Sequence, residues 1–290
     1  MKRLQELCEA GGRYLAAGDN YEHSRLVLLG APMDYTVSFR PGSRGGPQAI
    51  RAASPGLEEY SLAAGKDLRD ASFYDAGDLL LPLGNTQRSL QLIEAAAAEV
   101  WAAEKFPLLM GGEHLISLGA LRAAARRHKN LAVLHLDAHA DLRTEYLGEA
   151  DSHAAVMYHV HHELGLEIFQ FGIRSAAAEE VAYAERHTHF YPFQVLEPLR
   201  QVLPRLQGRP LYLSLDIDVV DPAFAPGTGT PEPGGITAAE LLAAVSLLSE
   251  LTVVGADVVE VSPAYDPAGI TAMLAAKVIR ELILAFACPD

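Results

Sequence analysis

The chain has 290 residues, half of them hydrophobic, and a formal net charge of −14. The hydrophobic half is enough for a substantial core and excludes a largely disordered chain. The negative charge disfavours non-specific binding to nucleic acid, which depends on neutralising phosphates, and is compatible with a cationic ligand.

The sequence carries no sign of a membrane or secretory protein. No apolar run approaches the roughly 18–20 residues that a membrane helix needs. No long apolar stretch follows residues 1–7 either, which argues against a secretory signal. The two cysteines, Cys8 and Cys288, lie near opposite ends of the chain, so a disulfide framework is not expected. We therefore expect a cytoplasmic protein.

Short apolar runs alternate with longer amphipathic runs along the chain. In chain order, the predicted strands are 25–29, 106–110, 131–137, 167–171, 211–216 and 253–261. The predicted helices are 86–105, 116–128, 197–206, 237–250 and 270–285. Gly30 is expected to stop the first strand, and Asn85 or Thr86 to cap the first helix. Thr237 precedes Glu240 by three residues, which is the spacing of a capping box.

This alternation indicates parallel strands connected by helices that cover both faces of a sheet. The strands are almost continuously apolar, as in strands buried on both faces. No repeat or linker is visible, so we expect one domain over residues 1–290. The pattern does not separate an open sheet from a closed (β/α)₈ barrel. In both folds, ligands bind beyond the carboxyl ends of the strands.

The end of the third predicted strand, residues 135–141, reads His-Leu-Asp-Ala-His-Ala-Asp. Residues two apart in an extended chain point to the same side, so Asp137, His139 and Asp141 can converge. Carboxylates and an imidazole on one face repel each other or lose hydration unless a cation holds them. Taken alone, the segment can also be an ordinary polar loop.

Two further strand ends carry residues of the same kind. Asp216 and Asp218 follow an apolar strand, where carboxylates are costly without a partner. His114, in Gly111-Gly112-Glu113-His114, supplies a second imidazole beside glycines that allow close approach to a ligand. Alone, an Asp-x-Asp pair is a weak signal, and a single histidine after a strand is more often a cap or core residue.

The combined set contains six candidate metal ligands: His114, Asp137, His139, Asp141, Asp216 and Asp218. Four carboxylates and two imidazoles are too many for one tetrahedral zinc and suit two divalent ions that share carboxylates. The oxygen-rich, thiolate-free set favours Mn²⁺, although zinc, cobalt or iron can occupy the same ligands.

These segments resemble the signature motifs of the arginase/agmatinase family of ureohydrolases, and agmatinases most of all. Further similar stretches are 42–47, 172–175, 223–235 and 257–266, in the family order along nearly the whole chain. The resemblance implies an α/β fold of three layers, αβα, around an eight-stranded, mostly parallel sheet of the arginase/deacetylase type. It also implies two Mn²⁺ ions bridged by Asp137 and Asp216. A homo-oligomer, either a trimer or a hexamer, is the assembly typical of the family.

The resemblance also assigns catalytic roles. Asp141 would orient the activated water and pass on its proton, and Glu260 would pair with the substrate guanidinium. His153 would donate or shuttle protons to the leaving group, although Ala154 and Ala155 follow it where agmatinases often have Gly-Thr. His135 is interpreted as a core residue or as one that supports the metal ligands from behind. The histidines at 159, 161 and 162 are interpreted as the solvated face of a helix.

One departure of this sequence from the arginase pattern bears on the substrate. Arginases hold the substrate carboxylate partly with an Asn two residues after the third ligand of the central motif, and Arg143 stands here. This favours agmatine, cleaved to putrescine and urea, over arginine. Aminopropylagmatine and guanidinobutyrate stay open as substrates. A single-zinc amidohydrolase similar to deacetylases and an inactive metal-stabilised scaffold are the rival classes, and the complete ligand set argues against both.

Overall fold

The computed structural model describes residues 2–9 and 11–288, and its centre is one large β-sheet. Its strands are β1 (Cys8–Glu9), β2 (Leu26–Ala31), β5 (Phe73–Leu79), β6 (Phe106–Gly111), β7 (Ala132–Leu136), β8 (Glu167–Phe171), β9 (His189–Tyr191), β10 (Leu211–Asp216) and β11 (Val253–Val259). They lie in the order β1-β5-β2-β6-β11-β10-β7-β8-β9. A separate hairpin is formed by β3 (Tyr60–Ser61) and β4 (Lys66–Asp67).

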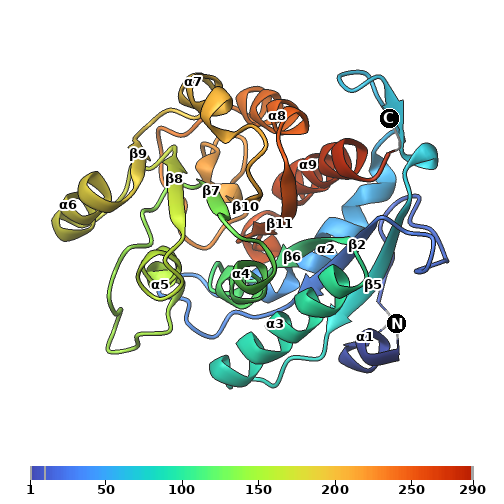
Figure 1. Cartoon of the computed structure of the whole chain (residues 1–290), viewed down its shortest axis with the longest axis horizontal. Helices are drawn as coiled ribbons and strands as arrows, with labels where there is room; N and C mark the ends of the chain where they lie inside the picture. The colour runs from blue at the N-terminus through green and yellow to red at the C-terminus, as the bar shows by residue number, and fades with distance from the viewer. Residues whose placement is uncertain (1, 10, 289–290) are drawn as a thin grey trace.

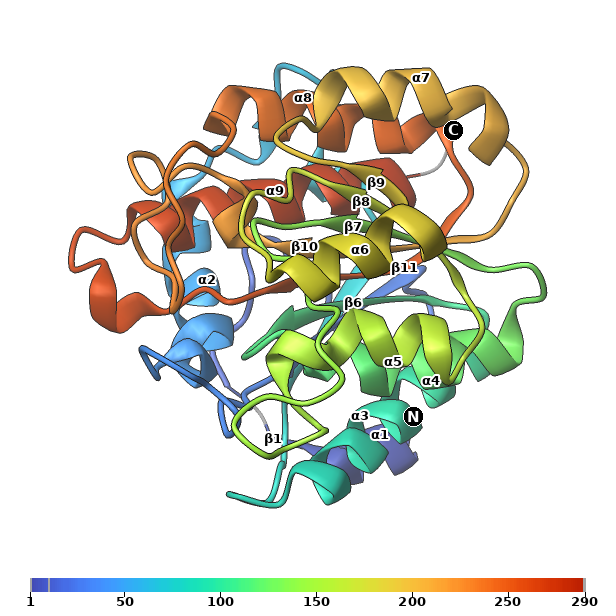
Figure 2. The ribbon, with the colours of Figure 1, turned by 90° about the vertical axis from the view of Figure 1, so that its left-hand side faces the viewer.

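Helices cover both faces of this sheet (Figures 1 and 2). They are α1 (Lys2–Leu7), α2 (Gly46–Ala53), α3 (Thr86–Ala102), α4 (Ile116–Arg127), α5 (Val156–His162), α6 (Ala178–His187), α7 (Leu196–Leu206), α8 (Ala238–Leu247) and α9 (Ile270–Phe286). In Figure 2, α7, α8 and α9 lie above the sheet, and α3, α4 and α5 lie below it. Side chains of successive strand residues point to opposite faces of the sheet. Leu28 packs in the core on one face and Leu29 in the core on the other.

The predicted three-layer fold with a mostly parallel sheet is confirmed. Among the described residues, eight strands of the sheet run parallel, and a ninth, β1, pairs antiparallel with β5 at one edge. The sheet therefore has nine strands rather than the expected eight. All six predicted strands are present, and the capping box of Thr237 and Glu240 begins α8 as expected.

The prediction that Gly30 stops its strand is wrong, because β2 continues through it to Ala31. Gly30 lies in the sheet between Met110 and Asp78. A Cβ atom at this position would lie 1.8 Å from Asp78 Oδ1. The glycine thus permits the close approach of β5 instead of ending the strand.

Four neighbouring strands at the middle of the sheet position the polar side chains. In sheet order they are β6, β11, β10 and β7. Because they are parallel, their carboxyl ends meet at one edge, where His114, Glu260, Asp216 and Asp137 follow them. No helix within the described ranges is both long and apolar enough to span a membrane.

Candidate active site

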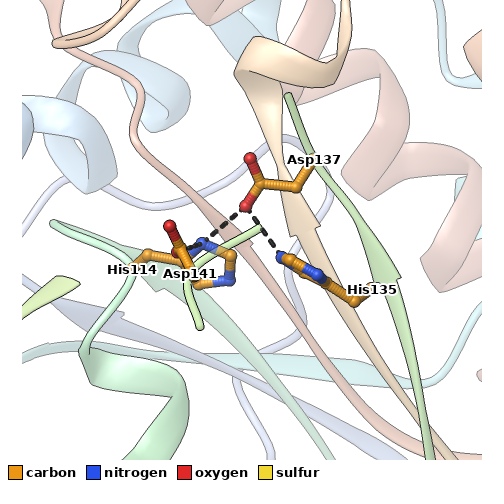
Figure 3. A group of neighbouring side chains, drawn as sticks. All are labelled: His114, His135, Asp137 and Asp141. Carbon is orange, nitrogen blue, oxygen red and sulfur yellow. Dashed lines mark hydrogen bonds and ion pairs between the residues drawn. The ribbon is translucent and has the colours of Figure 1, made fainter. Parts of the chain in front are cut away.

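The six predicted ligands form one cluster with two centres, and all of them are buried except the partly exposed His139. Around His114 Nδ1 lie carboxylate oxygens of Asp137 at 3.0 Å, Asp141 at 3.1 Å and Asp216 at 3.4 Å. Around His139 Nδ1 lie Asp218 Oδ2 at 3.0 Å and Asp137 Oδ1 at 3.6 Å. Asp137 thus presents one oxygen to each centre. Figure 3 shows it beside His114 and Asp141.

In its neutral form, His114 directs a lone pair at this cluster. Its Nε2 lies 2.9 Å from Ser214 Oγ, and that hydroxyl donates its own proton to Asp257 Oδ1 at 2.9 Å. Ser214 must therefore accept a hydrogen bond from Nε2–H of the imidazole. Nδ1 is buried and has no hydrogen-bond partner of good geometry. A ring lone pair and three carboxylate oxygens facing one point are the donor set of a metal cation.

The electrostatics of the cluster also call for added positive charge. Burial raises the pKa of Asp216 well above its ordinary value, and the nearby charges of Asp218 and Asp137 raise it further. Burial opposes protonation of His114, but the carboxylates around it outweigh burial and raise its pKa. The metal-free cluster must therefore hold extra protons, and divalent cations fit in their place.

His135 supports the cluster from within the sheet and is fully buried, as expected. Gln170 donates from Nε2 to the Ala140 carbonyl at 2.9 Å, which identifies that atom as the amide nitrogen, and it also lies 3.1 Å from His135 Nδ1. His135 Nδ1 therefore accepts, and its Nε2–H donates to Asp137 Oδ2 at 2.8 Å (Figure 3). With both ring nitrogens used, His135 orients Asp137 and is not a further ligand.

Glu260 follows β11 with a backbone φ of +64°, a strained conformation for a residue other than glycine. Its Oε1 accepts a hydrogen bond from the His114 N–H at 2.7 Å. Burial, with the charge of Glu113 adding to it, raises the pKa of Glu260 to about 8. A cation arriving beside this carboxyl group would favour its ionised form.

A cavity of about 330 Å³ joins these groups. Its walls include six of the eight predicted site residues: His114, His139, Asp141, His153, Asp216 and Glu260. Asp137 and Asp218 are buried beside it in the cluster. The structure thus brings the predicted side chains together, while their roles as ligands and catalysts remain predictions. The volume suits a small-molecule substrate.

Other wall residues were not predicted from the sequence. Ser38 lies in the loop after β2, with its Oγ 3.2 Å from His153 Nε2. Tyr146 and Glu180 come from segments without a recognisable motif. Glu113 lies outside the described walls of the cavity, and burial raises its pKa to about 7. Its place beside His114 in the Gly-Gly-Glu-His segment was the signal that could have identified it.

The histidines of α5 lie apart from the described cavity walls, as expected. His159 bonds to Glu163 and to the Ala150 carbonyl, and His161 Nδ1 lies 2.6 Å from the Tyr183 hydroxyl. His159 is nevertheless largely buried, so the interpretation of all three as a solvated face is wrong for this residue. Of the other two histidines, His161 is partly buried and His162 is exposed.

Arg143 is also on the cavity wall and brings a positive charge there. Its Nε lies 3.5 Å from Glu180 Oε2, and its guanidinium carbon lies 4.9 Å from the centre of the Tyr146 ring. The same Glu180 carboxylate accepts the backbone N–H groups of Leu142 and Ala177. Arg143 is therefore held beside the cavity by a carboxylate and an aromatic ring.

Comparison with known proteins identifies the family. The model of the arginase family matches residues 24–285. The chain belongs to the arginase family. An agmatinase of Bacillus subtilis is 49% identical over 96% of this chain and 97% of its own length. A guanidinobutyrase of Pseudomonas aeruginosa is 35% identical over 89% of this chain and 85% of its own. The crystal structure of a putative agmatinase from Clostridium difficile has a TM-score of 0.89, at 38% identity, covering 92% of this chain and 99% of that one.

This arginase-family membership confirms the resemblance read from the motifs, and it makes the chain a hydrolase. The family also has a metal site at its centre, in agreement with the cluster of histidines and aspartates found here.

Proposed function

We propose that this arginase-family hydrolase cleaves a guanidino group to urea and an amine, with agmatine as substrate and putrescine as the amine product. One observation carries the proposal: four of the six predicted ligands share the walls of a single small cavity with Glu260 and His153. The 49% identity with an agmatinase over almost the whole chain supports agmatine as the specific substrate.

Two Mn²⁺ ions are proposed as the cofactor. His114, Asp137, Asp141 and Asp216 would hold one ion, and His139, Asp137, Asp216 and Asp218 the other. The donor set of carboxylate oxygens and imidazole nitrogens, without thiolates, supports manganese. When bound, such an ion pair supplies Lewis-acid activation of a water molecule at neutral pH.

The residues of the chain position the substrate and move protons. The Glu260 carboxylate can accept two parallel N–H bonds from a guanidinium and so fix its plane in the cavity. Asp141 would accept the proton released as the guanidinium carbon is attacked. Burial lowers the pKa of His153, so this imidazole is neutral at pH 7 and can take up a proton before delivering it to the leaving amine.

A second candidate substrate is a guanidino acid such as guanidinobutyrate. The observation in its favour is the guanidinium of Arg143 on the cavity wall, which would attract a carboxylate tail. Glu180 beside it offsets much of that charge. Together with the greater similarity to an agmatinase, this balance keeps agmatine as the first choice.

The test is urea release from a panel of agmatine, aminopropylagmatine, guanidinobutyrate and arginine. The protein would be assayed after chelation, after Mn²⁺ addition, and with its metal stoichiometry measured. We expect agmatine to have the highest kcat/KM, activity to return with Mn²⁺, and two ions per chain. Urea release from no guanidino compound would overturn the proposal. One tight ion in a fully active enzyme would overturn the two-metal assignment.

The proposal includes a cytoplasmic homo-oligomer, a trimer or a hexamer, as is typical of the family. Light scattering coupled to size-exclusion chromatography gives the assembly directly, and a monomer at micromolar concentration would contradict it.

A further inference from the structure

Thr36 links a buried carboxylate to His153 beside the cavity. Its Oγ1 donates to Glu113 Oε2 at 2.9 Å, and the backbone N–H of His153 donates to the same Oγ1 at 3.0 Å. Glu113 is completely buried. Its two oxygens also accept the backbone N–H groups of Tyr35 and Thr36. One carboxylate thus fixes the start of the loop that reaches His153.

The direction of these bonds is set by chemistry. A backbone N–H can only donate, so the Thr36 hydroxyl must accept from His153. The single proton of that hydroxyl then goes to Glu113 Oε2 at 2.9 Å rather than to His153 Nδ1, which lies farther away at 3.5 Å. The Thr36 hydroxyl thus both accepts and donates a hydrogen bond. Removing the hydroxyl would break the link between Glu113 and His153.

The same loop also holds the imidazole ring. Ser38 Oγ lies 3.2 Å from His153 Nε2. The ring of Tyr146 meets the imidazole edge to face, with centroids 6.1 Å apart. Ser38 and His153 line the cavity, whereas Thr36 and Glu113 are absent from its described walls. The loop therefore contacts the His153 backbone through Thr36 and the ring through Ser38, and Thr36 Oγ1 also lies 3.5 Å from the ring Nδ1.

The geometry points to Thr36, anchored by Glu113, as a positioning residue. It holds the His153 imidazole in the position from which the ring can deliver a proton to the leaving amine. This inference rests on the proposed function, because it takes the proton transfer by His153 from it. Displacing a catalytic group by about 1 Å can cost about 100-fold in rate. The effect of losing the Thr36 hydroxyl should therefore appear in kcat.

The first test is Thr36→Val, which keeps the shape and removes the hydroxyl, with Thr36→Ser as the conservative variant. For Thr36→Val we expect kcat for agmatine to fall about 10- to 100-fold, with KM and bound manganese within about twofold of the unmodified enzyme. Thr36→Ser should retain most of kcat. Equal kcat for Thr36→Val and the unmodified enzyme would overturn the inference.

A double-mutant cycle separates positioning from general damage. If Thr36 acts through His153, adding Thr36→Val to His153→Ala should change kcat by less than about twofold. A full further loss would show an independent role and overturn the inference. Thr237→Val is the matched control, since it removes a threonine hydroxyl from the exposed start of α8. It should leave kcat and KM unchanged.

If Thr36→Val does not fold, Ser38→Ala tests the same role of the loop in positioning His153. It removes the contact to the ring, and its loss of kcat should also vanish in the His153→Ala background. Failure of the proposed function looks different, because the unmodified enzyme would then release no urea. An active enzyme in which His153→Ala, Thr36→Val and Ser38→Ala all keep full kcat would overturn only this inference.

Discussion

Gln170 acts on the predicted metal site through His135, and its own hydrogen bonds go to no predicted ligand. It fixes the tautomer of His135, which in turn donates to Asp137. Thr188 holds the amide from the other side, with its hydroxyl 3.0 Å from Gln170 Oε1. The orientation of Asp137 therefore depends on a chain of three side chains that the sequence places on different elements.

Replacing Gln170 with Leu should weaken manganese binding. The shape is nearly kept, but His135 loses the donor that selects its tautomer, so Asp137 loses its partner. Losses of this kind typically cost 10- to 100-fold in metal affinity, and we expect about 10-fold here. Competition with a fluorescent chelator measures it. Gln201→Leu, on the exposed face of α7, is the matched control, and equal affinities for the two variants would contradict the role of Gln170.

Arg143 should set the preference between cationic and anionic substrate tails. Replacing it with Ala removes a positive charge from the cavity wall, so the kcat/KM ratio of agmatine to guanidinobutyrate should rise about fivefold or more. Arg143→Lys keeps the charge and should leave the ratio close to its original value. A ratio unchanged in Arg143→Ala would place the substrate tail away from this wall.

At the scale of the elements, one side chain anchors the conformation of the segment between β10 and α8. The Arg174 guanidinium, just after β8, donates to backbone carbonyls of Asp218, Val219 and Glu232 at 2.7 to 3.1 Å. It thereby ties the start of this segment to its far side. Asp218 is one of the predicted ligands, so the metal site and the segment share this anchor.

Arg174→Lys should lower the free energy of unfolding by about 2 kcal/mol. A lysine ammonium cannot reproduce the planar set of donors that reaches several carbonyls at once. Urea denaturation measures the change. Arg186→Lys on the surface of α6 is the matched control, because Arg186 bonds a single carbonyl in its own helix. Equal stability of the two variants would contradict the anchoring role.

The strands also show which parts of the fold could be predicted from the sequence. Strands such as β8 and β10 were predicted with their exact bounds, because each is a short and mostly apolar run. β5 was missed, since Asp75, Gly77 and Asp78 interrupt it. Those aspartates face Arg51 of α2, which contacts both carboxylates. A strand that buries charge against a distant arginine cannot be recognised by hydrophobicity.

The predicted site residues could be identified from the sequence for a related reason. Seven of the eight end or follow apolar strands, so pattern and fold together predict that they converge. His153 follows no strand and was predicted from the family resemblance. Thr36, Gln170 and Glu180 carry no such pattern, because their partners come from distant parts of the chain. His135 could be predicted as buried, but its hydrogen bond to Asp137 requires knowledge of β8, which supplies Gln170.

On the scale of the whole molecule, the metal-free protein should lose stability as pH rises. Burial raises the pKa of Glu113 to about 7 and that of Glu260 to about 8, from an ordinary value of 4.5. Between pH 4.5 and 8 the folded state therefore holds protons that the unfolded chain has released, and the free energy of unfolding decreases. His153, whose pKa is lowered by burial, acts in the opposite sense only below pH 6.5.

Thermal melts at pH 5, 6.5 and 8 test this expectation. With a chelator present, the melting temperature should fall by about 5 °C or more across the range. With saturating Mn²⁺, the fall should be much smaller, because cations take the place of the protons. A melting temperature that rises with pH in the chelated protein would contradict the assignment.

The adjacency of β6, β11, β10 and β7 in the sheet also dictates when the site can form during folding. His114 and Glu260, which bond directly, are 146 residues apart in the chain. No early fragment contains both, and closing so long a loop is slow. We therefore do not expect the proposed metal ions to template the nascent chain. Because β11 lies between β6 and β10 in the sheet, we expect the ions to be taken up after β11 has docked, at the completion of folding.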